Sequence, residues 1–105
     1  MKIAIATINK KENSKISSRG GRAPYFLIFD ENGKLLESVS NPFAVGGGGA
    51  GIAVAKMLAD KKVDIVVAEA IGDNMAGALE ERGIKYYEKQ GVVKEVVQEV
   101  INLKK

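Results

Sequence analysis

Cysteine and histidine are both missing from this chain of 105 residues. Without cysteine the protein can form no disulfide, offer no thiolate to a metal and use no sulfur nucleophile. Without histidine it lacks the commonest general base near neutral pH and the commonest metal ligand. Any metal held directly by side chains would therefore need weaker oxygen donors.

Long apolar segments are missing as well. No apolar run approaches the roughly 18 to 20 residues that a membrane-spanning helix needs. The N-terminal MKIAIATI is followed at once by Asn9-Lys10-Lys11-Glu12, and it lacks the length and cleavage site of a secretion signal. With 46% hydrophobic and 28% charged residues, we expect a single domain over residues 1–105, located in the cytoplasm, with no membrane partner.

The charge is mixed along most of the chain, with 16 cations against 13 anions and a net charge of +3. No recognised nucleic-acid motif accompanies it, so we expect no nucleic-acid partner. The one dense basic cluster consists of Lys10, Lys11, Lys15, Arg19 and Arg22. It lies in a polar segment, residues 9–23, which is long for a connection, so we expect a functional loop that is more mobile than the sheet.

The hydrophobic pattern predicts alternating strands and helices. Strands are expected at 2–8, 25–30, 35–40, 63–70 and 84–87, and helices at 52–60, 73–82 and 92–103. Asn32-Gly33 marks a hairpin, so the second strand should be antiparallel to its neighbours. Valine favours strands, but the three- and four-residue spacing of the apolar positions makes the last segment a helix. This order predicts an α/β fold with a mixed sheet and helices on both faces.

The segment NPFAVGGGGAGIAVA places Gly46, Gly47, Gly48, Gly49 and Gly51 just before a predicted helix. A dinucleotide fingerprint would need a strand directly before it, and a phosphate-binding P-loop would need Lys and Ser or Thr after the last glycine. Neither condition is met. Two interpretations stay open: bare amides at a helix N-terminus that bind an anion, or glycines that only allow a tight turn and close helix packing.

A second glycine turn follows the fourth predicted strand, at Gly72, with Asp73 and Asn74 directly after it. In an open α/β sheet such turns gather at the carboxyl ends of the parallel strands, where ligands bind. The first strand ends at that same edge and leads into the basic loop. Three segments far apart in the sequence are therefore expected to line one positively charged crevice.

Four stretches resemble a known family in order and spacing: SSRGGRAPYFLIFD, NPFAVGGGGAGIAVAKML, VDIVVAEAIGDNMAGAL and GIKYY. The family is the dinitrogenase iron-molybdenum cofactor biosynthesis family, which includes the NifX-like proteins and the C-terminal domain of NifB. The resemblance covers nearly the whole chain. It implies a three-layer α/β/α fold with a ribonuclease H-like motif and a five-stranded mixed sheet with one antiparallel strand. It also implies a role as carrier or chaperone of anionic iron-molybdenum or other metal-sulfur clusters.

This chain departs from the family at one place. Members of the family often have His-Phe-Gly-Arg where this chain has Arg19-Gly20-Gly21-Arg22. Arginine is permanently charged and has no lone pair for a metal. A cluster would therefore be held as an anion by amides and arginines, or through oxygen donors. The oxygen-donor candidates are Asn9, Glu69, Asp73 and Asn74.

The ribonuclease H-like architecture raises the alternative of a nuclease. Two-metal chemistry needs converging carboxylates, and the first strand contributes none, while Asp64 is expected at the opposite edge. We therefore expect a non-enzyme. Two functions stay open: a carrier that passes a metal-sulfur cluster to a protein partner, or a metal-free module that binds another small anion. The predicted ligand-binding residues are Asn9, Arg19, Arg22, Gly46, Gly47, Gly48, Gly49, Gly51, Gly72 and Asn74.

Overall fold

The computed structural model describes residues 1–46 and 48–103 and contains every element that the sequence pattern predicts, within a few residues of its expected ends. The strands are β1 (Lys2–Thr7), β2 (Tyr25–Asp30), β3 (Leu35–Ser40), β4 (Ile65–Ala68) and β5 (Lys85–Glu88). The helices are α1 (Ala50–Asp60), α2 (Asp73–Glu81) and α3 (Val93–Leu103). Across the described residues, none of the helices combines the length and apolar composition that a bilayer crossing requires.

The five strands form one mixed sheet in the order β3-β2-β1-β4-β5. Strand β2 is antiparallel to both of its neighbours, β1 and β3. Strands β1, β4 and β5 are parallel to one another. Within this sheet β2 is therefore the strand that runs against the others, which confirms the predicted sheet with one antiparallel strand and the ribonuclease H-like arrangement.

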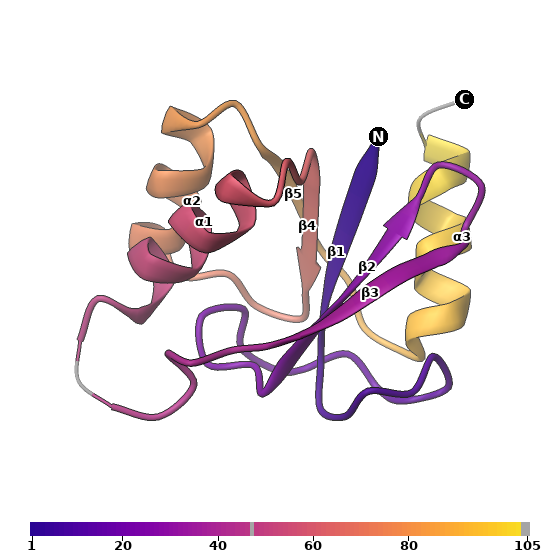
Figure 1. Ribbon diagram of the computed structural model, residues 1–105, viewed down its shortest axis with the longest axis horizontal. Helices are drawn as coiled ribbons and strands as arrows, with labels where there is room; N and C mark the ends of the chain where they lie inside the picture. Colours follow the sequence, from indigo (N-terminus) through magenta and orange to yellow (C-terminus); the bar gives the residue numbers. More distant parts are fainter. Residues whose placement is uncertain (47, 104–105) are drawn as a thin grey trace.

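Helices cover both faces of the sheet and give three layers (Figure 1). On β1, Ala4 and Ala6 face the core under α1 and α2, whereas Ile3 and Ile5 face the core under α3. All four side chains are fully buried. The alternation of small and large residues along one buried strand thus lets two helices pack on one face and one helix on the other.

The C-terminal segment is the helix that its spacing predicted. Its buried side chains, at three- and four-residue spacing, are Val93, Val96, Val97, Val100 and Ile101. They pack against Leu27 and Phe29 of β2 and against Val67 of β4. The gain from burying this stripe outweighs the preference of valine for strands.

The loop between β1 and β2 is anchored at several points. Ile16 is 4% exposed and belongs to the core under α3. The Ser17 N–H donates to the Ala6 carbonyl (2.8 Å), and the Gly20 N–H donates to the Ala70 carbonyl (2.9 Å). The loop therefore has more anchors than its polar composition indicates, and its second half is held against the end of β4. Its greater mobility stays a prediction.

Candidate functional site

One pocket opens at the carboxyl ends of β1 and β4, between the β1–β2 loop and the first turns of α1 and α2. Its cavity has a volume of about 580 Å³, a size typical of sites for small ligands. Its lining residues come from three separate parts of the chain: Arg19, Gly20, Gly21, Arg22, Gly49, Ala50, Gly51, Ala70, Gly72, Asp73, Asn74 and Met75. The structure thus brings together the three segments that the sequence predicted would meet.

Helix α1 begins at this pocket without a side-chain cap among the described residues. Gly49 is its N-cap residue and has a positive φ of 86°, a conformation that residues with a Cβ rarely adopt. The first helical hydrogen bond is donated by the Ala53 N–H to the Gly49 carbonyl (3.1 Å). The N–H groups of Ala50, Gly51 and Ile52 have no acceptor within the helix, and none of them donates to a backbone carbonyl among the described residues.

Helix α2 begins at the opposite side of the pocket in the same manner. Its N-cap residue, Gly72, has extended backbone angles and forms no side-chain cap. The Ala76 N–H makes the first helical hydrogen bond, to the Gly72 carbonyl (2.9 Å). Two helix N-termini, each with a partial positive charge, therefore converge on one cavity.

Helix α3 provides an internal contrast. Its Val93 N–H donates to the Ser14 carbonyl and its Lys94 N–H donates to the Glu12 carbonyl, both at 2.9 Å. The β1–β2 loop thus satisfies the donors at the start of α3 with its own backbone. Within the described chain, α1 and α2 begin at the pocket without such protein acceptors.

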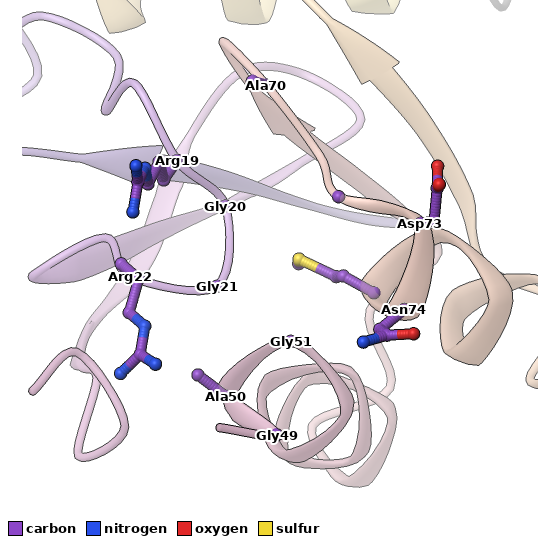
Figure 2. Close-up of a pocket in the computed structure, with 12 residues that line it drawn as sticks. Arg19, Gly20, Gly21, Arg22, Gly49, Ala50, Gly51, Ala70, Asp73 and Asn74 are labelled. Carbon is purple, nitrogen blue, oxygen red and sulfur yellow. The ribbon is translucent and has the colours of Figure 1, made fainter. Parts of the chain in front are cut away.

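The two arginines lie on one side of the pocket, and Asp73 and Asn74 lie on the other (Figure 2). The Arg22 guanidinium donates to the carbonyl of Gly46 (3.1 Å) and to that of Phe43 (3.4 Å), so it also holds the glycine-rich loop. Arg19 is exposed, and its side chain makes no hydrogen bond or ion pair with any described residue. Arg19 is thus the cation that a ligand can engage without breaking an existing contact.

Met75 lines the pocket but was not among the site residues predicted from the sequence. Met75 is 2% exposed, and its side chain lies against two glycines. A Cβ added at Gly20 would lie 2.9 Å from the Met75 sulfur, and one at Gly51 would lie 2.8 Å from the Met75 Cβ. A Cβ at Gly21 would come within 3.1 Å of the Gly51 backbone. Gly51 therefore allows the close approach of α1 and α2, which is the packing role that the sequence left open.

Several predicted site residues lie outside the pocket lining. The Asn9 side chain accepts a hydrogen bond from the Lys11 N–H (2.9 Å) and shapes the loop. Glu69 is exposed and its N–H donates to the Ser17 carbonyl (3.1 Å). Gly48 lines a neighbouring cavity with Phe43 and Val45, and the Gly46 carbonyl accepts a hydrogen bond from Arg22, which lines the pocket. Gly47 lies outside the described residues.

Side chains that ligate metals are scarce among the residues that line the pocket. Asp73 is the one carboxylate among its lining residues. No group of three or more histidine, cysteine, aspartate or glutamate residues that could hold a metal ion occurs within residues 1–46 and 48–103. Besides the Asp73 carboxylate, the lining offers the N–H donors of two helix N-termini and two guanidinium groups, which suit an anion.

Comparison with known proteins identifies the family. The family model described as "Dinitrogenase iron-molybdenum cofactor" matches residues 1–103. The chain belongs to this family. Its membership confirms the resemblance that the glycine-rich and arginine-containing motifs indicated. A search among curated proteins gave no match.

Solved structures of similar proteins share the fold. The apo form of the orange protein from Desulfovibrio gigas superposes with a TM-score of 0.90 at 26% identity, covering 96% of this chain and 87% of that one. A NifB candidate from Thermotoga, described as a DUF35 family member, gives 0.81 at 31% identity, with 96% and 87% covered. A dinitrogenase candidate from Methanocaldococcus jannaschii gives 0.66 at 21% identity, with 97% and 88% covered, and supports the fold alone.

Proposed function

We propose that this protein is a carrier or chaperone that holds an anionic iron-molybdenum cofactor, a precursor of it or a related metal-sulfur anion in the pocket. Family membership supports the class of cargo. The observation that carries the proposal is the convergence of two helix N-termini without side-chain caps and the Arg19 side chain on one cavity of about 580 Å³. The N–H groups and the guanidinium all bind negative charge. None of them replaces a ligand on a metal of the cargo.

The mode of holding is electrostatic and uses hydrogen bonds. Backbone N–H groups at the starts of α1 and α2 point their partial positive charge toward the cavity. Arg19 adds a full charge that the described residues do not neutralise, and Arg22 adds a second that is shared with the Gly46 carbonyl. A cargo bound without a covalent bond to protein can leave intact, which suits delivery to a protein partner. Every residue that we assign to the site binds the ligand, and none is given a catalytic role. We therefore propose no enzymatic step.

A metal-free module for a small oxyanion is the second candidate function. It is favoured by the absence of histidine and cysteine from the sequence. Both candidates use the same amides and arginines, so they differ in which anion the pocket prefers rather than in where it binds.

The test compares tetrathiomolybdate, molybdate and phosphate by anaerobic calorimetric titration. Arg19→Gln should raise the Kd of tetrathiomolybdate about fivefold to fiftyfold, the effect of losing a charge-assisted hydrogen bond in a partly exposed site. Arg82→Gln is the matched control, because Arg82 lies at the other end of α2 from Gly72. Its affinity should equal that of the wild type.

Substitutions of two glycines test whether the anion binds in the pocket or elsewhere along the glycine-rich loop. Gly72→Val adds a side chain at the pocket, at a position with extended angles and no heavy atom within 4 Å of the new Cβ, so it should weaken binding without unfolding the protein. Gly48→Val is the control, because Gly48 also has open space but does not line the pocket. Preference for phosphate over tetrathiomolybdate would support the metal-free module. If all variants bound the anions with equal affinity, the proposal that the anion binds in this pocket would be wrong.

A further inference from the structure

Asn41, the first residue after β3, joins the β1–β2 loop to the glycine-rich loop that leads into α1. It is 7% exposed. Its side-chain nitrogen Nδ2 donates to the carbonyls of Ala23 (2.8 Å) and Gly21 (3.1 Å), and its side-chain oxygen accepts from the Phe43 N–H (2.9 Å). The donors and the oxygen of one buried amide therefore hold two loops together.

The two carbonyls that accept from Asn41 lie on either side of Arg22 in the chain. Because both peptide groups are held, the direction in which the Arg22 side chain leaves the backbone is held as well. The Arg22 guanidinium donates to the carbonyls of Phe43 (3.4 Å) and Gly46 (3.1 Å), in the loop that Asn41 also holds. The hydrogen bonds thus form a closed network around a cation that lines the pocket.

The same peptide groups determine how far Arg22 lies from the start of α1. Gly21 approaches the first turn of that helix so closely that an added Cβ would lie 3.1 Å from the backbone of Gly51. A shift of the Gly21 backbone would therefore move Arg22 relative to the N–H groups at the N-terminus of α1.

Arg19 has different anchors. The N–H of its neighbour Gly20 donates to the Ala70 carbonyl (2.9 Å). The Ser17 hydroxyl donates to the Arg19 carbonyl (3.2 Å). Neither contact involves Asn41, so the two arginines of the pocket are positioned separately.

We propose that Asn41 is a positioning residue of the pocket, which holds Arg22 beside the N-terminus of α1 so that the guanidinium charge and the helix N–H groups act on the same anion. This inference rests on the proposed function and concerns the same site. Asparagine suits the role because its amide supplies two donors and an acceptor on one short side chain. An apolar side chain would supply none of them.

A double-mutant cycle tests whether Asn41 acts through Arg22. The Kd of tetrathiomolybdate is measured by anaerobic titration on the wild type, Asn41→Ala, Arg22→Gln and the double variant. Asn41→Ala should raise the Kd about threefold to tenfold, the effect of weakening one charge-assisted contact. In the Arg22→Gln background it should change the Kd by less than about twofold, because the charge that Asn41 positions is already gone. A residue that only stabilised the fold would weaken binding equally in both backgrounds.

Arg19→Gln is the matched background. Because Arg19 is anchored elsewhere, Asn41→Ala should raise the Kd there by the same factor as in the wild type. Loss of the effect in this background would overturn the proposal, since Asn41 would then shape the whole loop. An equal effect with and without Arg22, or no effect in the wild type, would also overturn it and leave the proposed function standing. A wild type that does not bind tetrathiomolybdate would overturn both proposals.

A second variant serves the same cycle if Asn41→Ala does not fold. Asn41→Ser keeps an oxygen that can accept from the Phe43 N–H two residues on, and it adds no charge. Its hydroxyl has one donor where the amide has two, so it cannot hold both carbonyls beside Arg22. Its effect on the Kd should again be smaller in the Arg22→Gln background, and an equal effect in the two backgrounds would overturn the proposal.

A measurement on the wild-type chain needs no substitution. The chain has three arginines, so a sample with ¹⁵N-labelled arginine gives side-chain signals from three residues. The signals of Arg19 and Arg22 should move on addition of tetrathiomolybdate, while that of Arg82 stays in place. If tetrathiomolybdate binds without moving the Arg22 signal, the anion is not held by Arg22 and the role of Asn41 is overturned.

Discussion

The substitution Gly51→Ala tests the packing of the two helices that form the pocket. The new Cβ would lie 2.8 Å from the Cβ of Met75 and 3.2 Å from its backbone N and Cα, which real Cβ atoms do not tolerate without movement. Helices α1 and α2 would have to separate. Overpacking of this kind costs about 1–3 kcal/mol. Replacing glycine by alanine in a helix offsets part of this by about 0.5–1 kcal/mol.

Gly77→Ala isolates the packing cost. Gly77 lies inside α2 and has no heavy atom within 4 Å of the added Cβ. Because both variants exchange a helical glycine for alanine, the propensity gain is shared, and the difference between them is the cost at Gly51 alone. Urea unfolding of the two variants should differ by about 1–3 kcal/mol, with Gly77→Ala above the wild type. Equal stability of the two variants would refute the close contact between α1 and Met75.

Three further predictions concern the loops and the hairpin. The N–H groups of Lys34 and Asn32 hold the pKa of Asp30 below its usual 3.8, so its stabilising effect is present above pH 3.8 and is lost as the pH falls through the lowered pKa. The melting-temperature gap between wild type and Asp30→Ala should close below that pH, and a gap that persists would contradict this. Ile16→Ala should destabilise by about 2–4 kcal/mol in urea unfolding, because Ile16 is buried under α3; an effect below about 0.5 kcal/mol would mean that Ile16 is no anchor. Arg22→Gln should speed amide exchange in the loop it holds while changing stability by no more than about 1 kcal/mol, and unchanged exchange there would count against the Arg22 contact.

The fold could be predicted from the sequence because its signals are local. The buried stripe of α3, the Asn32-Gly33 turn and the apolar run of β4 each identify an element without knowledge of its neighbours. The order of these elements then limits the possible sheet, since parallel strands need crossovers and crossovers cover faces. The ends of elements depend on tertiary contacts as well, and α1 begins two residues before the predicted start, with Ala50 buried at the pocket.

The site could be predicted only in outline, because its details depend on long-range contacts. The sequence indicated which three segments meet, yet it treated the glycines of the run alike. The structure gives Gly49 a left-handed conformation and Gly51 a packing role against Met75. Nothing local in the sequence marks Met75 as a lining residue, since a methionine in an amphipathic helix usually signals core. The anchoring of Gly20 to Ala70, across 50 positions of the chain, is equally invisible in the sequence.

The most direct test of the account is an amide spectrum of the ¹⁵N-labelled protein during titration with tetrathiomolybdate at low salt. We expect the N–H signals of Gly51 and Asn74, in the first turns of α1 and α2, to shift together with one affinity and to return when salt is raised. The signals of Val93 and Lys94 at the start of α3 should stay in place, because loop carbonyls already accept from them. Shifts at α3 equal to those at α1 and α2, or no shifts at all, would contradict the proposal that this pocket holds an anionic cargo.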